Sequence, residues 1–181
     1  MMSQNYKKKI KYFALFLAAV AVGFLIANQK RIVSIKNPTP TLTDSWELSA
    51  TENEETFKYP SDLSTKYIMP SDWPPVLNVY NETFTCNQAG KETERAGETK
   101  LETIAGHEYC VTRVTEGAAG SSYTQYAYAR AANDKTEILT FSLRFVQCGN
   151  YDEALMSECE VERAAFDIGP TVDEIFNTIK K

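Results

Sequence analysis

A run of sixteen uncharged, mostly apolar residues, 12–27, lies near the start of the 181-residue chain. As a helix rising about 1.5 Å per residue, the run would be roughly 24 Å long. Lysines at both ends could extend to the interfaces of a hydrocarbon core about 30 Å thick. The pattern predicts one transmembrane segment within residues 1–36, with basic flanks formed by Lys7, Lys8, Lys9, Lys11, Lys30 and Arg31.

Such a segment is either a retained anchor or a cleaved signal peptide. A signal peptide requires small residues at the two key positions of its cleavage site. The run ends in Leu25-Ile26-Ala27, where Leu25 is large, and the small pair Ala19 and Ala21 lies inside the run. We therefore favour a retained anchor. Its N-terminus is expected in the cytoplasm, because four basic residues precede the run and three follow it.

Charge divides the chain into two parts. Residues 1–36 hold seven of the 19 Lys and Arg residues and none of the 24 Asp and Glu residues. Residues 37–181 therefore hold 12 basic and 24 acidic residues, a net charge of −12. So acidic a surface repels phosphate backbones, since Lys and Arg provide nucleic-acid affinity by displacing counterions. We exclude nucleic acid as a main partner of this part.

The acidic part contains all four cysteines: Cys86, Cys110, Cys148 and Cys159. An even number in an exported domain is typical of disulfides, which persist in oxidising compartments. Proximity favours Cys86–Cys110 and Cys148–Cys159 among the three pairings that four cysteines allow. Zinc is the alternative, but zinc ligands usually come in closely spaced pairs, and His107 is the only histidine. We predict two disulfides, no metal and no cofactor, in a domain outside the cytoplasm.

Residues 37–53 are rich in Pro, Thr and Ser, which predicts an extended stalk. Trp46 and Leu48 near its far end would be costly to expose, so that end is expected to pair with the fold. The domain proper, 54–181, has mainly a β pattern. Its expected strands cover 56–59, 66–69, 76–80, 100–104, 107–115, 123–130 and 136–147. The paired prolines at 74–75 argue against a central strand there.

The last expected strand alternates clearly, with Leu139, Phe141, Leu143 and Phe145 on one face, which predicts one buried face. A helix is expected to follow near the C-terminus. Thr171 and Glu174 form a capping box, and its apolar face is formed by Val172, Ile175, Phe176 and Ile179. A further helical turn or two is expected within 153–167. The sum is an α+β domain: a mostly antiparallel, five- or six-stranded sheet with a C-terminal amphipathic helix.

Two short motifs carry a resemblance to a known fold. Phe57-Lys-Tyr59-Pro60 stands near the start of the domain and Asp173-Glu-Ile175-Phe-Asn-Thr178-Ile179 at its end, with hairpins between. This order resembles the PsbP-like α/β/α sandwich, although the cystines depart from that pattern. The whole chain also resembles uncharacterised membrane-anchored exported proteins of bacteria with reduced genomes. These resemblances imply a fold and a place in the cell membrane, and no functional residue.

The stretch 116–122 is the most suggestive loop, because glycines allow backbone N–H groups to approach an anion and serines add donors. We expect any small ligand to be bound by Gly117, Gly120, Ser121 and Ser122, with Tyr126 and Tyr128 as an aromatic platform. The alternatives are a plain connection between strands and tyrosines that pack in the core. His107 as a general base with Ser121 or Ser122 would indicate a hydrolase, but no complete catalytic set is present.

Three hypotheses for function follow. The leading one is an anchored, non-enzymatic domain that binds a partner protein or a component of the cell envelope. The second is a domain that binds a small ligand or a glycan. The third is a hydrolase.

Overall fold

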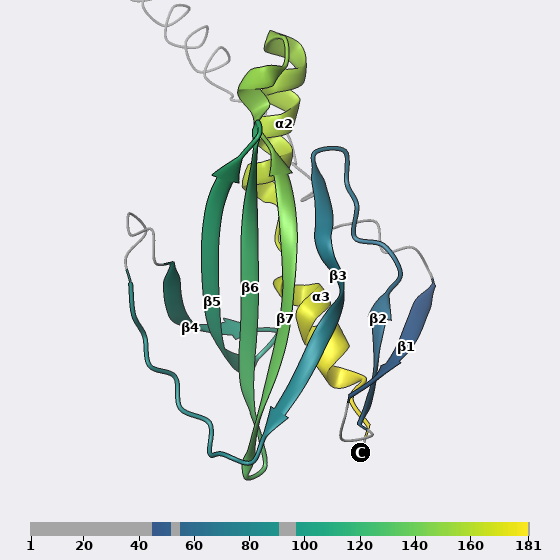
Figure 1. The fold of residues 1–181 in the computed structure, drawn as a ribbon, viewed down its shortest axis with the longest axis vertical. Coiled ribbons are helices and arrows are strands. Elements are labelled where there is room, and N and C mark those ends of the chain that lie inside the picture. The colour runs from purple at the N-terminus through teal and green to yellow at the C-terminus, as the bar shows by residue number, and fades with distance from the viewer. Residues whose placement is uncertain (1–44, 52–54, 91–96, 181) are drawn as a thin grey trace, which may run out of the picture. The chain divides into compact units, whose positions relative to one another are not determined.

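The computed structural model describes residues 45–51, 55–90 and 97–180. Its main element is a five-stranded antiparallel sheet in the order β3-β7-β6-β5-β4 (Figure 1). The strands are β3 (Ile68–Tyr80), β4 (Glu98–Ile104), β5 (His107–Ala118), β6 (Ser121–Ala132) and β7 (Lys135–Val146). The α+β class and the antiparallel sheet are confirmed. The predicted transmembrane run lies outside the described residues, within which no helix is long and apolar enough to cross a membrane.

A separate two-stranded sheet is formed by β1 (Trp46–Ala50) and β2 (Thr56–Pro60). Trp46 packs against the core, so the far end of the predicted stalk does pair with the fold. Leu48, by contrast, remains 67% exposed, so burial of this side chain was a wrong expectation. Tyr59 ties the two strands together by donating its hydroxyl to Glu47 at 2.8 Å.

The prolines of β3 explain its place at the edge of the sheet. The two predicted pieces, 66–69 and 76–80, are joined in one long strand that begins at Ile68, two residues later than predicted, and whose register with β7 shifts between Pro70 and Val76. An edge strand tolerates prolines because only one of its sides must supply ladder hydrogen bonds. Trp73 fixes the irregular part, donating its indole N–H to the carbonyl of Pro60 at 2.9 Å.

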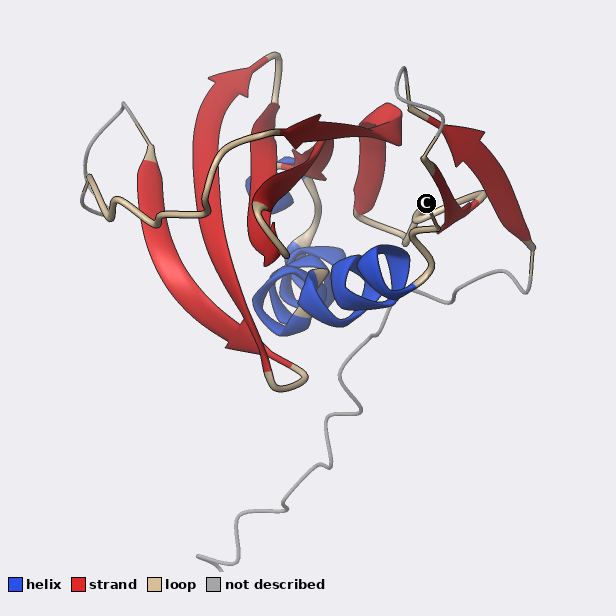
Figure 2. Ribbon diagram, turned by 90° about the horizontal axis from the view of Figure 1, so that it is seen from below, coloured by secondary structure: helices blue, strands red, loops and turns tan. Residues whose placement is uncertain are grey.

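Two α-helices cover one side of the sheet (Figure 2). They are α2 (Glu153–Ala165) and α3 (Gly169–Asn177), and α2 is preceded by the short 3-10 helix η1 (Cys148–Asn150). Asp152 caps α2 by accepting the N–H of Leu155 at 3.0 Å. Helical structure within 153–167 is confirmed, but its 13 residues form a longer helix than the turn or two expected.

The predicted start of the last helix needs a correction. Thr171 does not cap α3, which begins two residues earlier at Gly169 and buries Thr171. Asp167 accepts the N–H of Gly169 at 2.9 Å, and Pro170 has no N–H to satisfy in the first turn. These two features begin the helix without a capping box. The predicted apolar face is confirmed, with Val172, Ile175 and Phe176 buried and Ile179 packed against the core.

The core lies between the sheet and the helices. The alternation predicted for β7 is confirmed, since Leu139, Phe141, Leu143 and Phe145 are all buried. On β5, Tyr109 and Val111 are fully buried, which identifies the inner face of a strand whose pattern was ambiguous.

Both disulfides pair as proximity favours, Cys86 with Cys110 and Cys148 with Cys159. The first attaches the segment after β3 to β5, and the second attaches η1 to α2. Two cystines fit a domain in an oxidising compartment outside the cytoplasm. None of the four thiols is free, and no cluster in the described ranges could hold a metal ion.

Candidate functional site

The predicted Gly/Ser loop is largely a continuation of two strands. Gly117 pairs with Ser122 and Ala118 with Ser121, so the true connection is the two-residue turn Ala119-Gly120. The expectation of a loop over 116–122 was therefore too wide. Both turn residues have positive φ, as a tight hairpin requires.

This turn is attached to the start of η1. The carbonyl of Gly120 accepts the backbone N–H of Gln147 at 3.0 Å and the side-chain N–H of Asn150 at 3.2 Å. The β5–β6 hairpin end is therefore held beside the segment that leads into α2.

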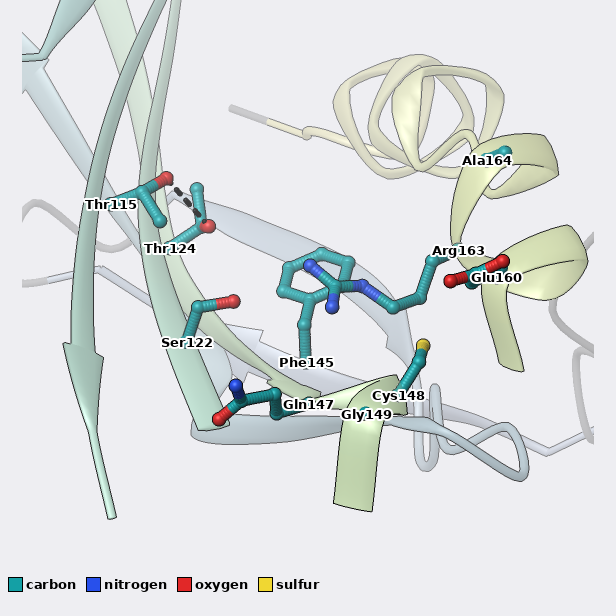
Figure 3. A pocket seen from close by; sticks show the side chains of 10 residues that line it. All are labelled: Thr115, Ser122, Thr124, Phe145, Gln147, Cys148, Gly149, Glu160, Arg163 and Ala164. Atoms are coloured by element: carbon teal, nitrogen blue, oxygen red, sulfur yellow. Dashed lines mark hydrogen bonds between the residues drawn. The ribbon is translucent and has the colours of Figure 1, made fainter. Parts of the chain in front are cut away.

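A groove with a cavity volume of about 630 Å³ opens between this hairpin end and α2 (Figure 3). Strands β5, β6 and β7 form one wall and α2 forms the other. The side chains that matter for its chemistry are those of Thr115, Ser122, Thr124, Phe145, Gln147, Glu160 and Arg163. Its size is within the range of pockets that hold small ligands.

Arg163 provides the positive charge of this groove. Its guanidinium lies over the ring of Phe145, 5.6 Å from the centroid, and one N–H is donated to the carbonyl of Val146 at 3.2 Å. The side chain is half-buried. No carboxylate within the described ranges forms an ion pair with it.

Two other polar side chains line the groove without a side-chain partner in the described residues. Neither the hydroxyl of Ser122 nor the amide of Gln147 forms a side-chain hydrogen bond with the part of the chain that the structure describes. Thr115 and Thr124, by contrast, bond to each other at 2.9 Å. Figure 3 shows Ser122, Gln147 and Arg163 around one space, into which each can offer a donor.

Tyr126 and Tyr128 do not form an exposed platform. Only 9% and 1% of these residues are exposed, and both rings stack with Phe141 in the core. Burial raises the pKa of Tyr126 to about 12, although the nearby Arg113 acts in the opposite direction. The core packing that the sequence left as an alternative is the role that the structure gives them.

His107 lies far from the serines proposed as its nucleophile. It starts β5, whereas Ser122 pairs with Gly117 near the other end of that strand. Gly117 lies ten positions after His107 along β5, roughly 30 Å of strand. His107 instead contacts Asp173 of α3, 2.7 Å from Nδ1 to Oδ1. This geometry excludes a catalytic pair between His107 and either serine.

Of the six proposed ligand-binding residues, Ser122 lines the groove. Gly120 acts through its carbonyl and Ser121 is buried, accepting the Nε–H of Arg144 at 3.0 Å. Sequence reasoning missed Gln147 and Arg163. The one signal that could have found them was the favoured Cys148–Cys159 pairing, which brings the middle of α2 to the end of β7.

Comparisons with protein-family models, with curated proteins and with solved structures find no match for this chain. Its function is therefore inferred from the groove and from the sequence.

Proposed function

We propose that the chain is a membrane-anchored binding protein of a bacterial cell envelope. One N-terminal segment, the uncharged run 12–27, lies in the cell membrane with the N-terminus in the cytoplasm. The acidic domain lies outside, which its two disulfides support. The domain binds rather than catalyses.

One observation carries the binding function: three polar side chains converge on one cavity, and each has N–H or O–H donors that no group in the described part of the chain accepts. Ser122, Gln147 and Arg163 come from β6, the β7–η1 connection and α2. Polar groups that converge in a concave, partly apolar site are typical of ligand recognition. The ligand is a small envelope component, or a terminus or side chain that a partner protein inserts into the groove.

The test uses the full-length protein in detergent micelles, with its alanine methyl groups labelled for NMR. Ala164 lines the groove and Ala132 lies at the far end of β6, so the first methyl is the reporter and the second is the control. Soluble peptidoglycan fragments should shift the Ala164 signal and leave Ala132 in place.

A blocking variant strengthens this test. Ser122→Phe fills the groove and should abolish the shift, whereas Ser71→Phe, at an exposed position of β3 outside the groove, should not. Fragments that bind equally well to both variants would place the ligand elsewhere on the domain and contradict the proposal.

A further inference from the structure

The guanidinium of Arg163 has most of its donors unused. A guanidinium carries five N–H groups in a planar fork, and the described chain accepts one of them, at Val146. The ring of Phe145 and the Val146 carbonyl hold the group in place. The remaining N–H groups are therefore positioned at the cavity before any ligand arrives, which reduces the entropy lost on binding.

The charge around the groove restricts the ligand. Among the lining residues in the described chain, Arg163 is the one cation and Glu160 the one carboxylate. Residues 37–181 carry a net charge of −12. A multiply charged phosphate would meet more repulsion than one guanidinium can offset, whereas a single negative charge would be balanced.

The geometry points to a carboxylate as the group that the groove recognises, an inference that rests on the binding function proposed above. The planar fork of Arg163 matches the two oxygens of a carboxylate. Ser122 and Gln147 can each donate to the same anion. The ring of Phe145 and the methyl group of Ala164 form an apolar wall, against which the remainder of the ligand can pack.

Two envelope sources supply such a group: the C-terminus of a peptide and an acidic sugar. The first experiment therefore uses two matched pairs of probes with the full-length protein in micelles. N-acetyl-trialanine is compared with its C-terminal amide, and glucuronate is compared with glucose. Shifts of the labelled Ala164 methyl give each affinity.

At least one acid should bind, and its neutral counterpart should bind about tenfold more weakly or worse, as expected when a charge-assisted hydrogen bond is lost. The acid that binds identifies the source. The inference is overturned if neither acid shifts Ala164 at concentrations up to about 10 mM, which would detect a Kd near 1 mM. The proposed function is judged separately, by the peptidoglycan fragments.

Variants of the groove give opposite expectations. Arg163→Gln should weaken the acid about tenfold or more, and Arg163→Lys should also weaken it, because lysine keeps the charge but lacks the fork. Lys58→Gln removes the same charge from an exposed site on β2 and should change nothing. Glu160→Gln should tighten the acid roughly twofold or more, since it removes a repelling charge.

A damaged fold could not explain the effect expected of Glu160→Gln, because damage would weaken binding of the acid, whereas this variant should bind it more tightly. If acid and amide bind equally and Ser122→Phe abolishes both, the groove binds its ligand by another group. That result would overturn the carboxylate inference and leave the proposed function standing.

Discussion

Nδ1 of His107 lies 2.7 Å from Oδ1 of Asp173, so the single histidine joins the start of β5 to α3. Tyr109 donates its hydroxyl to the same oxygen at 2.6 Å, and Asn177 donates to Oδ2 at 2.9 Å. Asp173 is only 5% exposed. This carboxylate is a buried connector between strand and helix, with both of its oxygens occupied.

Asp173→Asn should destabilise the domain and flatten its response to acid. Burial alone would raise the pKa of Asp173, but hydrogen bonds from Tyr109 and His107 together hold it below its ordinary value. A carboxyl whose folded pKa lies below the unfolded value, about 3.9, stabilises the fold above that pH. The contribution is lost as the pH falls through the lower, folded pKa.

Urea denaturation at pH 7 and pH 3 measures this effect. At pH 7 the variant should lose about 1–3 kcal/mol of unfolding free energy, the cost of weakening a buried charged hydrogen-bond acceptor. Between the two pH values the native protein should lose more stability than the variant. Asp134→Asn, in the exposed β6–β7 turn, is the control and should behave like the native protein. An equal fall with pH in native protein and Asp173→Asn would contradict the assignment.

Arg113 and Glu102 form a two-pronged ion pair between β5 and β4, with N–O distances of 2.5 and 2.8 Å. The hydrogen bonds from Arg113 lower the pKa of Glu102 despite partial burial. Because about a third of each side chain is exposed, we expect a coupling of about 1 kcal/mol in a double-mutant cycle of Arg113→Met and Glu102→Gln.

The matched control is the exposed pair Lys66 and Glu158, 2.7 Å apart, replaced by Met and Gln. Its coupling should be smaller and should disappear in high salt. A coupling of the same size in both cycles would show that the planar fork contributes nothing beyond charge.

What could be predicted from the sequence depended on local periodicity. The alternation of Leu139 to Phe145 fixes the inner face of β7, and the spacing of Val172 to Phe176 fixes that of α3, because both patterns are set by neighbours along the chain. The start of α3 was predicted wrongly because a capping box at Thr171 competes with Asp167 and Pro170. The local sequence does not show at which of these two places the helix begins.

The groove was beyond local patterns. Ser122 and Arg163 line the same groove because β6, β7 and α2 follow one another around the same end of the sheet. The Gly/Ser stretch pointed to Ser122, but Arg163 stands in no recognisable motif. Tyr126 and Tyr128 share a strand face with Ser122 but lie deeper along it, under the helices. The sequence alone shows that Ser122, Tyr126 and Tyr128 share one face of a strand. It does not show which of them the helices cover and which one faces the groove.

The two disulfides should have separable effects. Each closes a short loop, of 24 and 11 residues, and should stabilise the domain by about 3 kcal/mol in the chain-entropy model. Replacing Cys148 and Cys159 by Ser should also speed amide hydrogen exchange in α2, because that disulfide attaches the helix to η1. Replacing Cys86 and Cys110 by Ser should destabilise the domain by a similar amount. In that variant the ratio of amide exchange rates between α2 and β6 should stay as it is in the native protein. Uniform changes in both variants would contradict this division.

Intact mass from membranes, unreduced and treated with a thiol-alkylating reagent, tests the proposed topology. A full-length mass without alkyl groups is expected, because the proposed topology keeps the anchor and places both disulfides in an oxidising compartment. Loss of roughly the first 15–30 residues would mean a cleaved signal peptide and a released domain. Four alkylated thiols would reverse the proposed orientation.

Gly120 and Gly117 offer a matched comparison within one hairpin. Gly120 has φ +73°, and a Cβ there would lie 2.9 Å from Nδ2 of Asn150, which donates to the Gly120 carbonyl. Gly120→Ala should therefore cost about 1–2 kcal/mol of unfolding free energy, the usual penalty of a left-handed alanine.

Gly117 lies in β5 with no atom within 4 Å of an added Cβ. Gly117→Ala should be neutral or stabilising by up to about 1 kcal/mol, because alanine loses less backbone entropy on folding. Thermal or urea unfolding measures both, and equal losses would show that the turn is not held against Asn150.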